Sequence, residues 1–359
     1  MDDEWEPPLP AGYGDANRAF IQAFMARGAL TFREAQELLA AIKTAAASAA
    51  ASAEEGGGGE DSPGNNPRSP VRPQSITPAE VDNAMRVARE AVEPLDYDIR
   101  NARDQLRAGE RVWAFINAHS DPATQLGTAR SPEEVAYVKR LLDAMFETYN
   151  TPRMEVMAVD EGQALRVSRP AGARRESAMH SGNGENEDEN GEDGGATQSA
   201  AASRGLKHSE VLSLLSSLVA EGWLDKSRDG FYSLTARSLM ELWGWLMATY
   251  NDADADAPEW QRIKFCEACK EIVTSGQRCN NPDCVIRLHD ICEEAFWRAR
   301  AEKTCPKCST AWEGTHFVGE RAATSRSGFQ RGRGRRGRRS EAAAVEEAEE
   351  GAEESEDGE

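Results

Sequence analysis

Apolar residues in the first third of the chain recur at the spacing of amphipathic helices. The first predicted helix ends at Gly28, and its apolar stripe consists of Phe20, Ile21, Phe24 and Met25. A capping box formed by Thr31 and Glu34 begins a second helix, whose buried side consists of Leu38, Leu39 and Ile42. A third helix is predicted from Thr77 through about Val92, because the sequence Thr-Pro-Ala-Glu again supplies a helix start.

The spacing changes from helical to alternating in residues 96–117. The alternating apolar positions are Tyr97, Ile99, Val112, Ala114 and Ile116. Two such runs separated by the turn RAGE predict a β-hairpin. Three helices and a hairpin are the winged-helix layout, so we expect residues 13–120 to form winged-helix domain A, interrupted by a flexible insertion at 47–75. The acidic, proline-rich residues 1–12 are expected to be a disordered N-terminus.

A second unit of the same layout, winged-helix domain B, is predicted at residues 130–250. Its first helix begins at Ser131, and its apolar stripe consists of Val135, Val138, Leu142, Met145 and Phe146. A short helix is expected at 160–167 and a strongly amphipathic one at 209–221. Two short strands around an Asp-Gly turn follow, and Thr235 caps a last helix that reaches Leu246. Most of these apolar residues are expected to be core.

Charge decides how domain B is expected to act. The helix at 209–221 would enter the major groove in a DNA-binding winged helix, yet it contains no Lys or Arg and carries Glu210 and Glu221. Because phosphate contacts dominate DNA affinity, we favour protein docking over sequence-specific DNA reading for this domain. The acidic, apolar-poor residues 170–204 are predicted to be a disordered insertion within it.

All seven cysteines lie in residues 266–308, in the series C-x2-C-x9-C-x4-C-x4-H-x2-C-x12-C-x2-C. Ligand pairs at this spacing grip a metal from a tight turn, and eight soft ligands complete two closed tetrahedral zinc sites. In a cross-braced arrangement alternate pairs share an ion. One site then consists of Cys266, Cys269, His289 and Cys292. The other consists of Cys279, Cys284, Cys305 and Cys308.

Disulfides are the competing interpretation of the cysteines. An odd number of cysteines leaves one thiol over, and the opening MDDEWEPPLP does not read as a secretory signal. We therefore expect reduced thiols that hold two zinc ions, in the cytosol or nucleus. A closed zinc site does no chemistry itself, so any function comes from the surface that it supports.

The ligand order, with four Cys, one His and three Cys, is shared by PHD fingers and variant RING fingers. A PHD finger usually has Trp where this chain has Lys303, whereas RING fingers have Pro after the seventh ligand, as Pro306 is here. Residues 262–318 therefore resemble a RING finger, which offers a shallow apolar groove to a ubiquitin-conjugating enzyme. Our candidate groove residues are Phe296, Trp297, Pro306 and Ile272. Packing in the small zinc core is the alternative for each of them.

Two departures from the RING pattern bear on activity. Ala268 stands where the family usually has a large aliphatic residue, and Ser309 stands where an Arg often follows the eighth ligand. That Arg helps to hold charged ubiquitin closed. These replacements predict a ligase activity that is weak or depends on a partner. The mechanism expected of a RING ligase is scaffolding, in which a charged conjugating enzyme is held so that a substrate lysine can attack the thioester.

Composition limits the remaining classes of function. The chain has 359 residues and a formal net charge of -20, which allows two or three domains and does not suggest a general nucleic-acid coat. No apolar run approaches membrane-spanning length, so no membrane partner is expected. The tail at 319–359 is expected to be disordered; its segment RGRGRRGRR begins at Arg331, ends at Arg339 and precedes an acidic run. It predicts nuclear import or weak nucleic-acid contact, with a solvated tail as the alternative.

Two winged helices followed by a RING with a histidine fifth ligand resemble the non-SMC element 1 family, the RING-bearing subunit of the Smc five-six chromosome-maintenance complex. The segments that carry the likeness are RAFIQAFMARGALTFREAQELL and LVAEGWLDKSRDGFYSLTARSLMEL. The fold class expected is mainly α with small β. The resemblance implies docking of a MAGE-family winged-helix subunit, engagement of a kleisin subunit and indirect contact with the SMC heads.

The resemblance also implies ubiquitin ligase activity aided by the MAGE partner, and a role in DNA repair and recombination in the nucleus, on chromatin. A non-catalytic architectural or DNA-binding subunit, whose finger only mediates protein interaction, is the alternative.

Overall fold

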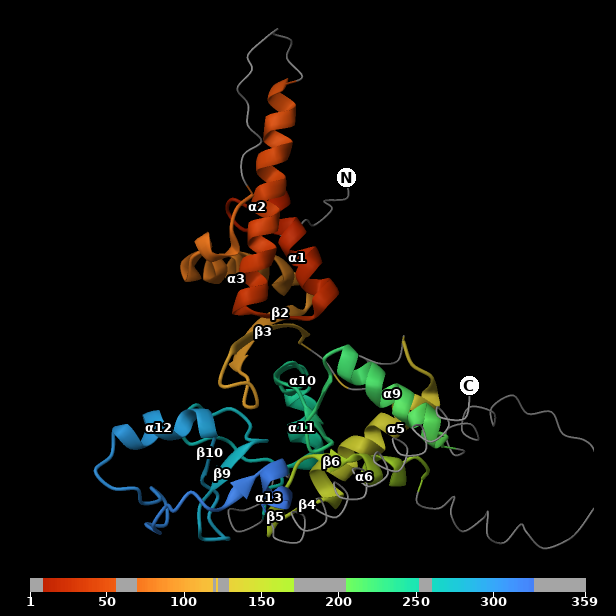
Figure 1. Cartoon of the computed structure of the whole chain (residues 1–359), viewed down its shortest axis with the longest axis vertical. Coiled ribbons are helices and arrows are strands. Elements are labelled where there is room, and N and C mark those ends of the chain that lie inside the picture. The colour runs from red at the N-terminus through yellow and green to blue at the C-terminus, as the bar shows by residue number, and fades with distance from the viewer. Residues whose placement is uncertain are drawn as a thin grey trace, which may run out of the picture. The chain divides into compact units, whose positions relative to one another are not determined.

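The computed structural model describes residues 9–55, 70–118, 121, 129–170, 205–251 and 260–325. The chain divides into two compact units (Figure 1). The first unit consists of Met1–Ala144 and Val159–Ile263, and the second of Met145–Ala158 and Lys264–Glu359. Both are built from helices and small antiparallel sheets, as expected for the predicted fold class.

The N-terminal half of the first unit has three helices and a three-stranded antiparallel sheet in the order β1-β3-β2. Its elements are α1 (Asp15–Arg27), β1 (Ala29–Thr31), α2 (Phe32–Glu55), η1 (Pro73–Ser75), α3 (Pro78–Val92), η2 (Glu93–Leu95), β2 (Tyr97–Arg103) and β3 (Arg111–Asn117). Gly28 ends α1 with φ 71°, a left-handed conformation that glycine tolerates because it has no Cβ. Its N–H donates to the Phe24 carbonyl.

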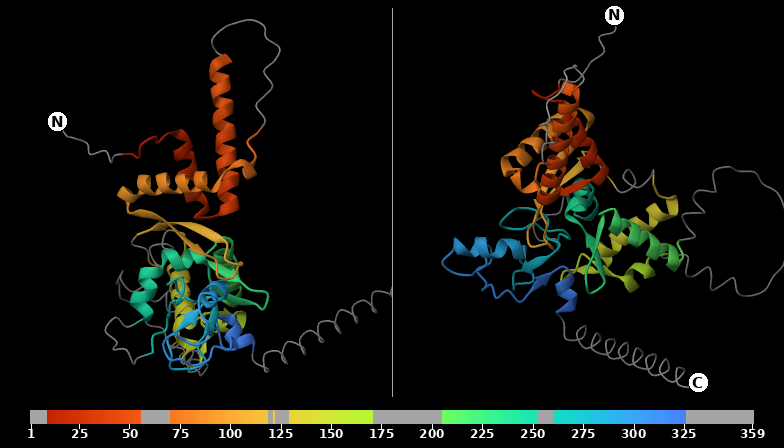
Figure 2. Two further views of the ribbon diagram at one scale, coloured as in Figure 1. Left: turned by 90° about the vertical axis from the view of Figure 1, so that its left-hand side faces the viewer. Right: turned by 45° about the horizontal axis from the view of Figure 1, so that its top comes forward.

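Helices α1, α2 and α3 lie on one side of this sheet (Figure 2). Their shared core contains Phe20, Phe24, Leu30, Val81, Met85, Ile99, Trp113 and Phe115. The capping boxes expected at Thr31 and Thr77 are formed, since Glu34 and Glu80 each accept the backbone N–H of the Thr three residues earlier. The three helices and the hairpin therefore enclose one apolar core.

The C-terminal half of the first unit has a second sheet of three strands, in the order β6-β8-β7. Its elements are α5 (Pro132–Asp143), β6 (Val159–Asp160), α6 (Glu161–Arg166), α9 (His208–Ala220), β7 (Leu224–Lys226), β8 (Phe231–Leu234), α10 (Ala236–Glu241) and α11 (Trp243–Tyr250). The last predicted helix is divided into α10 and α11, because the backbone of Leu242 (φ -91°, ψ 7°) leaves the helical region. Tyr137 donates from its hydroxyl to the Ala164 carbonyl at 3.2 Å and so joins α5 to α6.

The two halves of the first unit meet where α10 packs against β2 and β3. Ala114, Ile116 and Met240 form a small buried cluster there. Beside it, the backbone N–H of Asn117 donates to the buried carboxylate of Glu241 at 3.0 Å. The two winged helices are thus joined by tertiary contacts as well as by the chain.

Four segments differ from the sequence-based expectations, and one of them is η1, which lies within the insertion expected at 47–75. Helix α2 continues through residues expected to belong to the insertion at 47–75, because the alanine-rich stretch that follows Ile42 has the highest helix propensity. Residues expected in the tail at 319–359 form α13 (Glu320–Thr324). Residues Met145–Ala158, expected in domain B, belong to the second unit. Residues 171–204 and 331–339 lie outside the described part of the chain.

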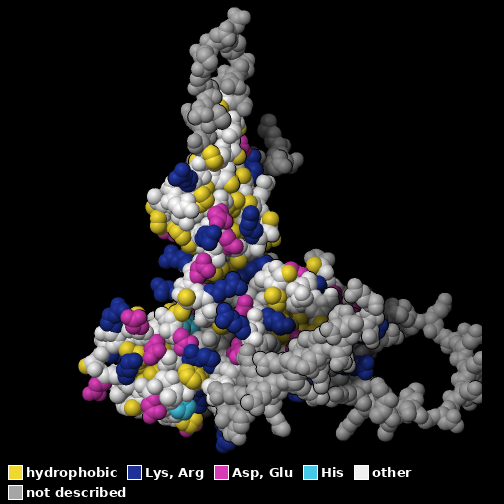
Figure 3. Space-filling view, viewed as in Figure 1, with side chains coloured by type: hydrophobic (Ala, Val, Ile, Leu, Met, Phe, Trp, Pro, Cys, Tyr) yellow, Lys and Arg dark blue, Asp and Glu magenta, His cyan; other side chains and the backbone are white. Residues whose placement is uncertain are grey.

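The described surface carries both signs of charge. On the face drawn in Figure 3, Lys and Arg side chains lie among Asp and Glu side chains. Among the described residues, every helix is too short or too polar to cross a membrane.

Candidate metal centre

The second unit is built around a small sheet with the order β10-β9-β11, which α12 and α13 contact. Its elements are η3 (Ala144–Thr148, a π-helical turn shared with the first unit), β4 (Asn150–Thr151), β5 (Met154–Glu155), β9 (Gly276–Arg278), β10 (Arg287–Leu288), α12 (Asp290–Arg298), β11 (Phe317–Val318) and α13. Helix α12 begins right after His289, which places that imidazole and Cys292 one helical turn apart. Cys292 therefore lies on α12, and Cys279 and His289 directly follow β9 and β10.

The two Cys-x2-Cys segments are tight turns of the same kind. Lys270 donates its N–H to the Cys266 carbonyl at 2.9 Å, and Ser309 donates its N–H to the Cys305 carbonyl at 2.9 Å. Lys270 and Ser309 have left-handed backbones, with φ 66° and 57°. Each turn folds back directly after its second cysteine, and this directs both thiols of a pair to one point.

The eight predicted ligands lie in two groups of four. One group is Cys266, Cys269, His289 and Cys292, and the other is Cys279, Cys284, Cys305 and Cys308. Within each group the ligand atoms all lie within 4.8 Å of one another. These are the two sets that the cross-braced pairing predicts, drawn from ligand pairs that alternate along the sequence. Two groups of this composition can bind zinc.

Sulfur separations in the second group fit a tetrahedral ion. The Sγ atoms of Cys279 and Cys308 are 3.4 Å apart, and those of Cys284 and Cys305 are 3.6 Å apart. A tetrahedron with zinc–sulfur bonds of about 2.3 Å has edges of about 3.8 Å. Burial, together with the neighbouring thiols, raises the pKa of Cys279 and of Cys284. Thiolates at these positions therefore require a compensating cation.

His289 presents one defined nitrogen to the first group. Its Nδ1 lies 3.3 Å from Cys269 Sγ and 3.8 Å from Cys292 Sγ, while Nε2 lies 3.0 Å from the Ile272 carbonyl oxygen. A carbonyl only accepts hydrogen bonds, so the proton is on Nε2 and the Nδ1 lone pair is free to bind a metal. This second contact fixes both the tautomer and the direction of the ring.

The four candidate groove residues do not share one environment. Ile272, Phe296 and Trp297 are 2%, 7% and 5% exposed, and only Pro306 is on the surface. The Trp297 ring lies 4.9 Å from that of Phe296 and 5.6 Å from that of Trp312, and the Arg300 guanidinium covers Phe296 at 3.6 Å. Three of the four candidates therefore fill the core of the finger.

The second unit also contains a buried charged network that the sequence did not predict. It consists of Glu155, Lys264, Arg278 and Arg287. Burial alone raises the pKa of Glu155, but hydrogen bonds and charge from Arg287 and Lys264 outweigh it and lower that pKa to about 2. All three cations are within two residues of a metal ligand in the sequence, which is a weak signal. Glu155, more than a hundred positions away, has no such signal.

Tandem winged helices and a cross-braced RING-like finger define the class of protein, and comparison with known sequences places this chain within it. The sequence model of the family described as "Nse1 non-SMC component of SMC5-6 complex" matches residues 17–242, and that of a "RING-like domain" matches residues 266–308. The chain belongs to the Nse1 family. The family resemblance drawn from the sequence and the predicted fold class are thereby confirmed.

Relatives of known identity give the same assignment. The "Non-structural maintenance of chromosomes element 1 homolog" proteins of Xenopus laevis and Xenopus tropicalis are each 36% identical over 110 residues, which is 31% of this chain. The chain spans 36% of the length of these relatives. A chain of a solved "Nse1-Nse3-Nse4 complex" aligns with a TM-score of 0.54 and 18% identity, over 85% of this chain and 99% of that chain. At this identity the likeness shows a shared fold.

Proposed function

We propose that this protein is a RING-type ubiquitin ligase subunit and winged-helix scaffold of the SMC5-6 complex. The observation that carries the proposal is the pair of four-ligand groups in a RING-like finger. Each group holds one zinc ion through three or four thiolates, and His289 Nδ1 completes the first group. The ions supply folding free energy to a short segment and leave no open position for a substrate.

Ligase activity comes from positioning rather than from a reacting side chain. The finger binds a charged conjugating enzyme and holds its thioester where a substrate lysine can attack it. Of the residues considered for this contact, Pro306 is exposed, and Phe296 and Trp297 support the same small domain from within. The exposed Ala268 and Ser309 offer little apolar or cationic contact, so activity that depends on a partner is expected.

The ligase proposal is tested with purified full-length protein, a ubiquitin-conjugating enzyme and a MAGE-family partner. Chain formation is expected to need the partner, and Pro306→Ala is expected to lower it several-fold while two zinc ions per chain are retained. Glu313→Ala, a change at another exposed position of the finger, is the control. Unchanged chain formation by Pro306→Ala would remove this residue from the proposed contact. No chain formation with any conjugating enzyme would remove the ligase role.

The partners proposed are a MAGE-family winged-helix subunit and a kleisin subunit, through which contact with the SMC heads is indirect. Support comes from the fold shared with a chain of an Nse1-Nse3-Nse4 complex. We further propose a nuclear, chromatin-associated protein that acts in DNA repair and recombination, with weak nucleic-acid contact through residues 331–339. Affinity purification from nuclei with mass spectrometry tests the assignment, and recovery of transcription factors without these subunits would contradict it.

A non-catalytic architectural subunit is the second candidate. The burial of three groove candidates favours it, because little of their apolar surface is available to a conjugating enzyme. A Pro306→Ala strain that repairs DNA damage as the wild type does, and that retains partner binding, would support this candidate over the first.

A further inference from the structure

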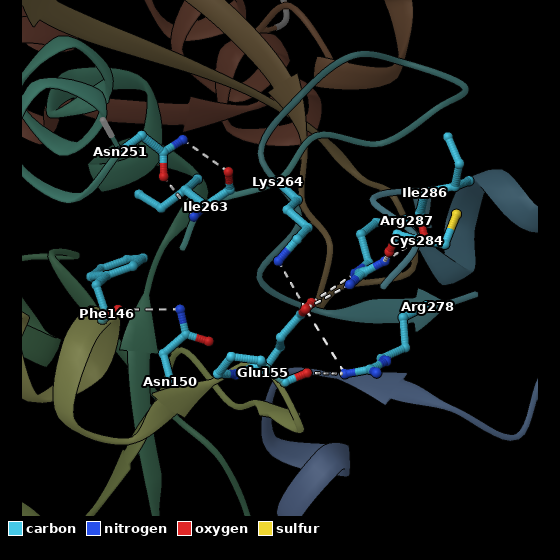
Figure 4. A network of polar contacts seen from close by, with 11 residues as sticks. Phe146, Asn150, Glu155, Asn251, Ile263, Lys264, Arg278, Cys284, Ile286 and Arg287 are labelled. Carbon is cyan, nitrogen blue, oxygen red and sulfur yellow. Dashed lines mark hydrogen bonds and ion pairs between the residues drawn. The ribbon is translucent and has the colours of Figure 1, made fainter. Parts of the chain in front are cut away.

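The buried charged network centres on the carboxylate of Glu155, at the end of β5 (Figure 4). Arg287 binds it through two parallel hydrogen bonds, from Nε at 2.7 Å and from Nη2 at 2.6 Å. Lys264 Nζ donates at 2.9 Å, and Arg278 Nη1 lies 3.9 Å away while it donates to the Pro152 carbonyl at 2.9 Å. All four charged side chains are at most 7% exposed.

The backbone of Glu155 is also held, by the residue that follows β11. Its carbonyl accepts the N–H of Gly319 at 2.7 Å. Gly319 has φ 85°, and a Cβ there would lie 2.3 Å from the Thr274 carbonyl oxygen, so a larger residue would disturb this approach. The hairpin of β4 and β5 is therefore tied to Gly319 through its main chain and to Arg287, within the cysteine-rich segment 266–308, through its side chain.

Arg287 connects Glu155 to both groups of ligands. Its Nη1 donates to the carbonyl of Cys284, a ligand of the second group, at 2.7 Å. Its own carbonyl accepts the N–H of Glu267, inside the first Cys-x2-Cys turn, at 2.8 Å. His289, a ligand of the first group, follows two residues later. Arg287 is thus linked to the second group through its side chain and to the first group through its main chain.

The network carries more positive than negative charge. Glu155 is the only buried carboxylate among the described residues of the second unit, and it faces three cations. An excess of buried charge of one sign destabilises a protein by several kcal/mol. Four thiolates around one divalent ion leave two negative charges, and Cys279 and Cys284 belong to that group. The loaded site therefore offsets the excess of buried cations.

We propose that Glu155 is a positioning residue for both metal centres, which acts through Arg287 and makes the hairpin of β4 and β5 part of one metal-dependent folding unit. The inference rests on the proposed zinc binding. Because Met145–Ala158 joins α5 to β6 along the chain, loss of zinc releases a segment between two elements of the second winged helix. The metal centre thereby reaches beyond the cysteine-rich segment.

Hydrogen exchange on the full-length wild-type protein tests this coupling. With zinc bound, amides of 145–158 and 264–318 are expected to be protected. After a chelator removes the metal, both segments are expected to lose protection together, while β2 and β3 keep theirs. A hairpin that stays protected after the cysteine-rich segment has opened would overturn the coupling. A purified protein without zinc, unaffected by chelator, would instead overturn the proposed metal binding.

Glu155→Gln tests the positioning role, because it removes the charge and keeps the size of the side chain. Groups that orient metal ligands directly contribute about 10- to 100-fold to metal affinity, and Glu155 acts one step further away through Arg287, so release of both zinc ions to a chromogenic chelator is expected to accelerate by up to about 10-fold, in one phase. Glu294→Gln, which alters an exposed pair with Arg298, is the matched control and is expected to release zinc as the wild type does.

If Glu155→Gln releases zinc at the wild-type rate, or releases only one of the two ions faster, the positioning role is refuted. A merely structural contribution would lower the unfolding temperature and leave the release rate below that temperature unchanged.

Discussion

The core of the first winged helix is made of aromatic and aliphatic side chains, with Phe24 in edge contact with Phe20 and Phe115. The second unit buries most of its thiols, one imidazole and a network of four charged residues, beside the rings of Phe296, Trp297 and Trp312. The first unit has enough apolar surface to fold on that basis. The second unit is small, and it depends on metal–ligand bonds to hold its polar interior together.

This difference predicts how each unit responds to the loss of a side chain or of a metal ion. Apolar burial is the sum of many small terms, so losing one side chain weakens the first unit by degrees. Metal sites act as wholes, because the loss of one ion leaves four ligands close together beside three buried cations that share one carboxylate. We therefore expect graded effects in one unit and all-or-none effects in the other.

Metal removal should give the largest contrast. A structural zinc ion contributes on the order of 10 kcal/mol of folding free energy, so chelation is expected to unfold the finger and leave the first winged helix folded. Near-ultraviolet circular dichroism should lose the signal of Trp297 and Trp312, while far-ultraviolet helix signal largely remains. A single thermal transition that shifts as a whole on chelation would show that the two units do not unfold separately.

Truncation in the apolar core should give the next largest effect, in the opposite unit. Phe24→Ala removes a fully buried ring and is expected to destabilise the first unit by about 3–5 kcal/mol in urea unfolding. Zinc content should stay at two ions per chain. Met25→Ala, at a half-exposed position of the same helix, is the control and should change stability by less than about 0.5 kcal/mol. Loss of zinc from Phe24→Ala would contradict the separation of the two units.

The smallest effect concerns the contact between the two winged helices. Gly28 and Gly222 both have left-handed backbones, with φ 71° and 77°, so alanine costs about 1–2 kcal/mol at either. At Gly28 a Cβ would also lie 2.4 Å from the Arg237 guanidinium, which stacks on Trp223 at 4.5 Å, whereas nothing lies within 4 Å at Gly222. Gly28→Ala is therefore expected to lower the free energy of unfolding by about 1 kcal/mol more than Gly222→Ala does, because it displaces the cation–π contact between Arg237 and Trp223. Equal urea midpoints for the two variants would show that Arg237 moves aside freely.

Much of the fold was readable because the signals are local. Capping boxes, the hairpin turn and the ligand spacing each depend on residues a few positions apart, and they mark helix starts at Thr77 and Ser131 and the metal-binding turns. The burial of a side chain, by contrast, depends on residues that are distant in the sequence. Phe296 and Trp297 have the spacing expected of a groove, yet Trp312 and Arg300 enclose them, which periodicity does not reveal. The extent of α2 was misjudged for another reason, since its alanine-rich end was taken as low-complexity sequence rather than as strong helix former.

The sequence by itself determined which eight side chains can form two closed metal sites and where the winged-helix elements begin, because spacing along the chain decides which ligands and caps can meet. Only the tertiary structure decided that Met145–Ala158 belongs with the finger and that Arg287 pairs with Glu155. A carboxylate and a guanidinium 132 positions apart carry no periodic or spacing signal. Their pairing follows from the burial of both charges at one place, which exists only once the chain has folded.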